Sequence, residues 1–314
     1  MRTLAAATLT LFLSPAAHPP ASAAQDEPAK MEWAFTESDR FDFVWSYNEQ
    51  RKRDPGRGET TETHDKRDVT AELVWKAEGI LDLTLKKVVW NYGTQDFEVT
   101  LTYLEGKKLE PQLKMKVATT APGFAVSKGD ADRMIEYMKT LTEGHFTIDT
   151  VTEKGRTNVL WNGASVRSTS SLSLLARIFT HPLLPSGPVR VAQLFKDPLD
   201  VTNLPVGLTE VKEVESKVAA ISEKGYIAKG GVSIPVGKSS VSKRGTQTMT
   251  GNFTYSCEWN YSPQQYLQGA KEESKFTKKV QATGDDADFY KENFNHTITQ
   301  VLAIKKKGAK DEKK

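Results

Sequence analysis

Strict alternation of apolar and polar residues is the feature that most constrains the fold of this 314-residue chain. In the stretch RFDFVWSYNEQRKR, the aromatic residues Phe41, Phe43, Trp45 and Tyr47 occupy every second position. Successive side chains of a β-strand point to opposite faces, so this spacing predicts a strand with one apolar face. Similar stripes recur later, with these apolar members: Val69, Ala71, Leu73 and Trp75; Leu81, Leu83 and Leu85; Phe97, Val99, Leu101 and Tyr103; and Leu113, Met115 and Val117. The aromatic quartet is therefore the first instance of a general strand pattern.

Short connections between the stripes predict antiparallel pairing of neighbouring strands. Turn-like strings such as KAEG, NYGTQ and EGKKLEP separate consecutive stripes. Connections of this length join strands that lie next to each other. The first half of the chain therefore predicts a meander of about six strands with one apolar face.

Two segments break the strand period and predict amphipathic helices. In the segment 130–143, Asp130 can cap the start of a helix and Gly144 can end it. The second segment, 170–180, stops before Pro182. The apolar residues at helical spacing are Met134, Ile135, Met138 and Leu141 in the first segment and Leu172, Leu175, Ile178 and Phe179 in the second. Both helices are expected to pack on a sheet.

The strand pattern returns after the helices. Two hairpins are expected to turn at the shared string EKG, at 153–155 and at 223–225, and a proline-rich crossing covers 182–205. The last strand is predicted to place these residues on one face: Phe294, His296, Ile298, Gln300, Leu302 and Ile304. We expect a single β-rich domain over 32–304, with two similar halves that meet near 182–205 as the alternative.

Both ends of the chain differ in composition from this domain. Residues 1–23 combine Arg2, an apolar run and a small-residue end, which is the layout of a secretory signal peptide. Residues 24–31 form a polar linker, and 305–314, KKKGAKDEKK, are expected to be a basic disordered tail. We therefore expect an exported protein, periplasmic or extracellular, that is soluble after signal cleavage.

Charge and cysteine content limit the partners of the chain. The formal net charge of +3 comes from the tail, and the remainder is close to neutral, so the electrostatic footprint of a nucleic-acid binder is missing. No later segment is apolar and long enough for a transmembrane helix. The single cysteine, Cys257, rules out an intramolecular disulfide and is expected to pack as a small hydrophobe, with a disulfide-bonded dimer as the alternative. The oligomeric state is left open.

A highly polar stretch follows the first aromatic stripe. Between Glu49 and Asp68, six basic side chains are balanced by six acidic ones. The string RKRDPGRGETTETHDKRD therefore predicts a neutral and mobile hairpin loop.

No catalytic or metal-binding constellation is visible in the sequence. The four histidines that follow the signal segment include no pair at i, i+4 spacing, and a lone strand histidine such as His296 is expected to be a packed or surface residue. The G-x-S-x-G elbow is absent, and GVSIPVGKSS departs from phosphate-loop spacing at Val232. The carboxylates of GDDADFYKEN lack the glycine and the closing glutamate of a calcium loop. We predict no catalytic residue, no metal site and no cofactor, and favour a non-enzymatic protein.

An export signal, an aromatic-rich meander from Trp33 to Val117, two amphipathic helices and returning long hairpins occur together in this chain. In this layout it resembles secreted bacterial β-rich proteins that share a domain of unknown function. It is more loosely similar to the periplasmic lipoprotein-carrier half-barrels. The resemblance implies a mainly β (α+β) fold, with a curved antiparallel sheet or half-barrel of long hairpins and two amphipathic helices packed on it. It covers most of 32–304 and carries over no functional residue.

Three functions follow from this layout. The first is a secreted or periplasmic non-enzymatic protein that binds an apolar small molecule, such as a lipid, or an envelope protein in the hollow of a curved sheet. The candidate residues for an apolar concave face are Phe41, Phe43, Trp45, Tyr47, Trp75 and Trp90. The second is a structural or interaction module of the cell envelope, whose aromatic residues fill a core. The third, least supported, is a carboxylate-based hydrolase of an envelope polymer, which requires two facing carboxyl groups in a groove.

Overall fold

A computed structural model of the chain describes residues 39–76, 80–142, 146–149, 158–161, 164–165, 190–199, 212–262, 267–284 and 291–308. These residues form an antiparallel β-sheet and one α-helix, α1 (Phe124–Thr142). The predicted β-rich class and antiparallel pairing are confirmed, because every strand pair in the described part of the chain is antiparallel.

The sheet is built from two sequential groups of strands. The first group consists of β1 (Arg40–Asp54), β2 (Thr61–Trp75), β3 (Ile80–Gly93), β4 (Phe97–Leu104), β5 (Glu110–Met115), β6 (Phe146–Asp149), β7 (Asn158–Trp161) and β8 (Ala164–Ser165). The second group consists of β9 (Leu194–Leu199), β10 (Lys212–Ser222), β11 (Gly225–Ser242), β12 (Gly245–Tyr261), β13 (Leu267–Ala282) and β14 (Glu292–Lys306).

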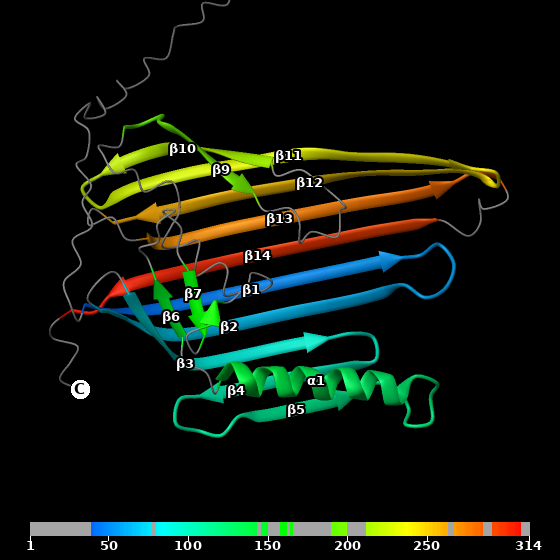
Figure 1. The fold of residues 1–314 in the computed structure, drawn as a ribbon, viewed down its shortest axis with the longest axis horizontal. Helices are drawn as coiled ribbons and strands as arrows, with labels where there is room; N and C mark the ends of the chain where they lie inside the picture. The colour runs from blue at the N-terminus through cyan, green and yellow to red at the C-terminus, as the bar shows by residue number, and fades with distance from the viewer. Residues whose placement is uncertain are drawn as a thin grey trace, which may run out of the picture.

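The first and last long strands pair at the middle of the sheet. The strand order is β8-β7-β6-β3-β2-β1-β14-β13-β12-β11-β10-β9, with β4 and β5 branching from β3. Trp45 of β1 lies opposite Val69 of β2 and opposite Leu302 of β14. Figure 1 shows the long strands running side by side, with β1 of the first group next to β14 of the second group. The order begins and ends in strands with one neighbour each, so the sheet formed by the described residues does not close.

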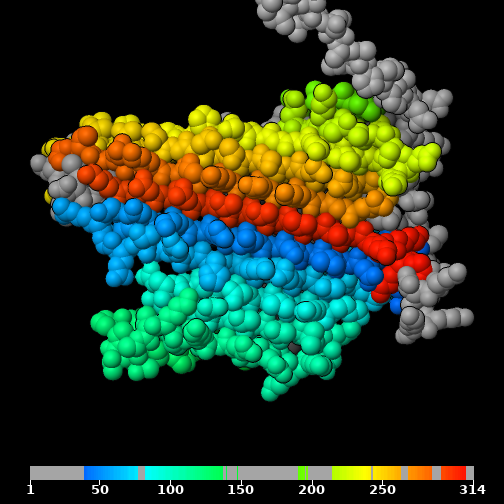
Figure 2. Space-filling view, turned by 180° about the vertical axis from the view of Figure 1, so that it is seen from behind, coloured from blue at the N-terminus to red at the C-terminus, as the bar shows by residue number. Residues whose placement is uncertain are grey.

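One face of this sheet, here called the inner face, carries the apolar stripes. The first stripe behaves as predicted, since Phe41, Phe43 and Trp45 are buried whereas Asp42 and Val44 between them are exposed. The main core cluster continues across the sheet through buried residues of the neighbouring strands, among them Leu73, Phe253, Trp259, Phe276 and Leu302. The opposite, outer face is seen in Figure 2, where the long strands form a continuous surface.

The helix α1 covers the end of the first group of strands. It lies over β4 and β5 (Figure 1), and its Ala131, Met134 and Ile135 pack on the smaller core cluster around Val99 and Leu101. The helix begins at Phe124, six residues before the start predicted at Asp130. Gly129 and a first turn with exposed Val126 hide the apolar period there. The second predicted helix, 170–180, lies outside the described residues, so a pair of helices is not confirmed.

The mobile hairpin loop predicted for residues 51–68 is wrong for most of its length. The strand β1 runs to Asp54 and β2 starts at Thr61, so only residues 55–60 connect them. Polar residues fit this hairpin because its outer face is exposed and because charges pair across the strands, as in Lys52 with Glu62 at 2.5 Å. The polar string therefore extends the sheet.

The hairpin predicted at 223–225 is confirmed. The strands β10 and β11 pair antiparallel and are joined through Glu223 and Lys224, while the turn predicted at 153–155 lies outside the described residues. At the other end of the second group, β14 runs to Lys306, two residues beyond the domain boundary expected at 304. The ammonium group of Lys307 then lies 2.7 Å from Glu72 of β2.

Candidate functional site

A belt of polar side chains crosses the otherwise apolar inner face. On β1 the inner face continues beyond the aromatic residues to Glu49, Arg51 and Arg53, because alternation persists to the end of the strand. Antiparallel register places Asp65 of β2 opposite Glu49 and His296 of β14 opposite Arg51. The polar belt is defined here as Tyr47, Glu49, Arg51, Asp65, Arg67 and His296.

Glu49 is the hub of one half of the polar belt. Nε2 of His296 lies 2.6 Å from Oε1 of Glu49, and the hydroxyl group of Tyr47 donates to Oε2 at 2.6 Å. Arg51 adds an ion pair at 2.5 Å, and both Glu49 and His296 are buried. Burial by itself raises the pKa of Glu49. The hydrogen bonds from His296 and Tyr47 and the charge of Arg51 outweigh burial and lower this pKa to about 2.

The ionised state of Glu49 determines which atoms carry protons around it. A carboxylate can only accept hydrogen bonds, so Nε2 of His296 must carry a hydrogen atom toward Glu49. The pKa of the Tyr47 hydroxyl is raised, first by burial and then by the negative charge of Glu49. This half of the belt is therefore a saturated hydrogen-bond network around one buried negative charge.

Asp65 organises the other half of the polar belt. Arg67 binds Asp65 in a two-pronged ion pair, with Nε 2.9 Å from Oδ1 and Nη2 2.6 Å from Oδ2. The indole nitrogen of Trp90 donates to Oδ1 of the same carboxylate at 2.7 Å. The guanidinium group of Arg67 also lies over the ring of Trp90, 4.8 Å from its centroid, and 5.3 Å from that of Tyr47. Both carboxylates of the belt are thus occupied by partners within the protein.

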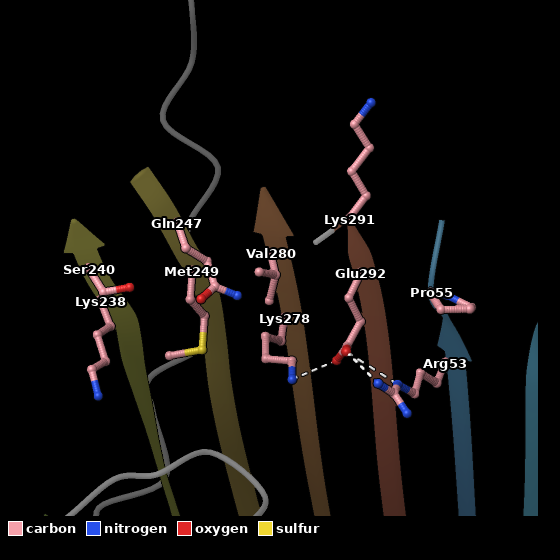
Figure 3. A pocket seen from close by; sticks show the side chains of 10 residues that line it. All are labelled: Arg53, Pro55, Lys238, Ser240, Gln247, Met249, Lys278, Val280, Lys291 and Glu292. Atoms are coloured by element: carbon pink, nitrogen blue, oxygen red, sulfur yellow. Dashed lines mark hydrogen bonds and ion pairs between the residues drawn. The ribbon is translucent and has the colours of Figure 1, made fainter. Parts of the chain in front are cut away.

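Next to the polar belt, the inner face carries a pocket of about 500 Å³ at the end of the sheet. It is here called the basic pocket. Four cationic side chains line it, from Arg53 on β1, Lys238 on β11, Lys278 on β13 and Lys291 immediately before β14. Glu292 is the one acidic side chain among the lining residues that the structure describes. In Figure 3, Lys278 and Arg53 are directed toward Glu292, whereas Lys291 extends away from it and Lys238 lies on a more distant strand.

The floor of the basic pocket is partly apolar. Strand register places Met249 of β12 between Lys238 of β11 and Val280 of β13, and Val280 lies opposite Glu292. Pro55, Ser240 and Gln247 complete the lining. A pocket of this kind offers positive charge at its walls and apolar contact at its base.

Glu292 bridges two of the cations in the basic pocket. Nζ of Lys278 lies 2.6 Å from Oε1 of Glu292, and Nη2 of Arg53 donates to Oε2 at 3.0 Å (Figure 3). Burial raises the pKa of Glu292, but the hydrogen bonds from Lys278 and Arg53 prevail and lower it below its usual value. Lys278 also sits over the ring of Phe294, 5.5 Å from its centroid.

The six aromatic residues predicted for a concave face lie elsewhere on the inner face. Phe41, Phe43 and Trp45 are buried in the main core cluster, and Tyr47 and Trp75 pack against it. Trp90 belongs to the smaller cluster under α1. None of these six residues lines the basic pocket.

Sequence reasoning missed both the polar belt and the basic pocket. It assigned Arg51, Asp65 and Arg67 to a mobile loop, counted Glu49 only among the acids that balance the basic residues, and treated His296 as a packed or surface residue. One signal was present, because inner-face positions on β1 continue at every second residue from Phe41 through Arg53. Alternation on the last strand likewise placed His296 on one face with Phe294 and Ile304. Which strands lie next to one another had no local signal, since β11, β13 and β14 reach the site only through long-range strand pairing.

The described residues contain no group of three or more His, Cys, Asp or Glu side chains placed to hold a metal ion. In the described part of the chain, no helix combines the length and apolar character needed to cross a membrane.

Comparison with known proteins gives no family for this chain. No protein-family model matches it, and no curated protein matches it. Among solved structures, it is similar to a lipovitellin structure concerned with lipid–protein interactions, at 9% identity and a TM-score of 0.42, over 88% of this chain and 26% of that one. This chain therefore spans about a quarter of the lipovitellin chain.

Weaker likenesses involve two bacterial proteins. Pseudomonas aeruginosa OccK2 is 6% identical with a TM-score of 0.20, over 86% of this chain and 99% of that one. An outer membrane channel from Pseudomonas putida F1 is 7% identical with a TM-score of 0.17, over 87% and 97% of the two chains. The resemblance to secreted β-rich proteins and to lipoprotein-carrier half-barrels therefore stays a prediction.

Proposed function

We propose that this protein is an exported, non-enzymatic binding protein that holds a small anionic amphiphile in the basic pocket. The observation that carries the proposal is the pocket lining, in which four cations surround one carboxylate above a floor that includes Met249 and Val280. The cations attract an acidic headgroup, and the floor accepts a short apolar segment.

Size and charge support this proposal. A volume of about 500 Å³ falls within the range of small-molecule sites. The chain outside its basic tail is close to neutral, so four cations and one carboxylate among the described lining residues are a local concentration of positive charge.

The aromatic half of the inner face supports a different role, that of a packed structural core. Phe41, Phe43 and Trp45 have exposed fractions of 2%, 1% and 4%. Side chains buried to this extent leave no room for a ligand among them. The predicted structural module of the cell envelope therefore remains the second candidate function, and it would use these residues for stability.

The acidic residues of the inner face give little support to a hydrolase. A glycosidase needs one carboxyl group with a raised pKa, protonated near neutral pH, to act as general acid. Glu49 has a lowered pKa, and Asp65 opposite it is occupied by Arg67 and Trp90. Among the described residues, the basic pocket holds one carboxylate, Glu292, which binds two cations.

Calorimetric titration with octyl sulfate and with neutral octyl glucoside tests the proposal. These ligands share an apolar tail and differ in headgroup charge. We expect octyl sulfate to bind measurably and octyl glucoside to bind at least about tenfold more weakly, because one charge-assisted hydrogen bond contributes roughly 1.5–3 kcal/mol.

Paired lysine variants provide the matched control. We expect the double variant Lys238→Gln, Lys291→Gln to lose most of the octyl sulfate affinity, since both lysines line the basic pocket. The variant Lys279→Gln changes the sequence neighbour of Lys278 on the outer face and should bind like the wild type. Equal binding of the charged and neutral ligands, or equal loss in both variants, would contradict the proposal.

A further inference from the structure

Two cations of the basic pocket are directed at one position, and the carboxylate of Glu292 occupies that position. Nζ of Lys278 lies 2.6 Å from Oε1 of Glu292, while Nε and Nη2 of Arg53 donate to Oε2 at 3.2 and 3.0 Å. Each carboxylate oxygen therefore has its own cation. Figure 3 shows the two cationic side chains reaching Glu292 from either side. The basic pocket thus contains an anion-binding position, and a carboxylate of the protein itself fills it.

The strand register fixes the backbone positions of these two cations independently of Glu292. Phe294 of β14 lies opposite Arg53 on β1 and opposite Lys278 on β13, so the three residues form one row across the inner face. The ammonium group of Lys278 lies 5.5 Å from the centroid of the Phe294 ring. Glu292 is two residues away on the same face of β14 and reaches this row diagonally. The two cations therefore flank the same position whether or not Glu292 fills it.

Glu292 and an anion from solution compete for the same donors. Glu292 is the first residue of β14, so its carboxylate is tethered beside the two cations at a high effective concentration. The side chain of Arg53 is 57% exposed, however, which lets an anion from solution reach its guanidinium group. An ion pair with an exposed partner contributes little to stability. The contact between Glu292 and Arg53 can therefore be exchanged for a contact with a ligand.

We propose that Glu292 is an internal competitor, which occupies the anion-binding position of the basic pocket and lowers its affinity for ligands. This inference rests on the proposed function and concerns the regulation of the same site. The acidic headgroup of the ligand replaces the Glu292 carboxylate between Lys278 and Arg53, and Glu292 turns toward solvent. Lys238 and Lys291 add positive charge at other points of the lining. An anion that contacts only one of the two central cations does not displace Glu292.

Calorimetric titration of octyl sulfate into the full chain and into two Glu292 variants tests this inference. We expect Glu292→Gln to bind octyl sulfate about tenfold more tightly than the wild type, because the ligand no longer displaces a carboxylate that holds charge-assisted hydrogen bonds. Glu292→Asp keeps the negative charge, but its side chain is one methylene group shorter, which withdraws the carboxylate from both cations. Its affinity should lie between those of the wild type and Glu292→Gln.

The matched control is Asp54→Asn, which removes one negative charge beside Arg53 and leaves the anion-binding position unchanged. Asp54 is the next residue of β1, so alternation places it on the outer face. Its Oδ1 accepts a hydrogen bond from the backbone N–H of Gly56, and the amide oxygen of asparagine can retain this bond. Salt screens such a charge, so the affinity of Asp54→Asn should stay within about twofold of the wild type.

The outcomes separate this inference from the proposed function. If the wild type and Glu292→Gln bind octyl sulfate equally, the internal competitor is wrong and the proposed function stands. Equal gains in Glu292→Gln and Asp54→Asn would attribute the effect to net charge and would also overturn the inference. If neither the wild type nor a Glu292 variant binds octyl sulfate, both the inference and the proposed function are wrong. Glu292→Asp carries the comparison with the wild type if Glu292→Gln does not fold.

Discussion

Substitution of Glu49 is the most direct test of how polar contacts on the inner face stabilise the fold. Its buried carboxylate accepts hydrogen bonds from the buried His296 and from Tyr47, and it forms an ion pair with the exposed Arg51. A buried carboxylate is stabilised only while these partners remain. Removing its charge leaves their donors facing a group that cannot accept them all.

We therefore expect Glu49→Gln to lower the free energy of unfolding by about 3 kcal/mol, measured by urea denaturation at pH 7. The control is Glu258→Gln, because Glu258 forms an ion pair with Lys229 in which both side chains are exposed, at 42% and 58%. Exposed pairs contribute less than about 1 kcal/mol. Equal effects of the two substitutions would show that the belt does not stabilise the fold.

The same residue predicts how stability depends on pH. The pKa of Glu49 is about 2 in the folded chain against an ordinary value of 4.5. A depressed folded pKa stabilises the protein above the unfolded pKa, and this contribution is lost as the pH falls from about 4.5 toward about 2. Urea midpoints of the wild type should fall over this range. The Glu49→Gln variant should have a flatter profile, and parallel profiles would contradict the assignment.

At the scale of the element, the β10–β11 hairpin turns where a glycine is obligatory. Gly225 has a φ of +115°, and a Cβ atom there would lie 1.7 Å from the carbonyl oxygen of Tyr261 on β12. Gly237, on the same strand β11, has open space around the same position. The two glycines therefore have different roles within one strand.

Substitution of each glycine by alanine separates these roles. We expect Gly225→Ala to lower the free energy of unfolding by about 3 kcal/mol, because the backbone of β11 and β12 must separate. Gly237→Ala should be neutral or stabilising by up to about 1 kcal/mol, since alanine loses less conformational entropy on folding. Thermal or urea unfolding of both variants measures this difference. Loss of stability in Gly237→Ala alone would contradict the turn geometry.

At the scale of the whole molecule, β1 and β14 join the two groups of strands into one sheet. Phe43 of β1 lies opposite Ile304 of β14, and the register continues to Asp54 opposite Asn293. The main core cluster includes residues of both groups on either side of this junction. Neither group can separate without exposing that core to water.

We expect the two groups to unfold together. Hydrogen–deuterium exchange in increasing urea should give the same opening free energy for peptides from β3 and from β12, because both depend on the β1–β14 junction. The edge strand β5 serves as control and should exchange faster, since it pairs with β4 alone. Opening of one group at lower urea than the other would instead support two separable halves.

The alternation of the chain determined its strands and its apolar face without any further information. Phe41, Phe43 and Trp45 were predictable as one buried stripe, and Phe97, Val99 and Leu101 as another, because the period of a strand is a local property. The pattern did not predict the start of α1 at Phe124, since the first turn of the helix and Gly129 lack a clear helical period.

Only the tertiary structure decided where the polar side chains meet. Glu49 and His296 are 247 positions apart, and Arg53 and Glu292 are 239 apart, so no local pattern links them. Their meeting depends on the antiparallel pairing of β1 with β14, which brings the first and last long strands together at the centre of the sheet. Strand pairing is set by the total burial of the apolar face, and a one-residue change in register would move every one of these side chains to the other face. The sequence by itself determined a sheet with one apolar face, and the register of its first and last strands determined that this face also carries a polar belt and a basic pocket.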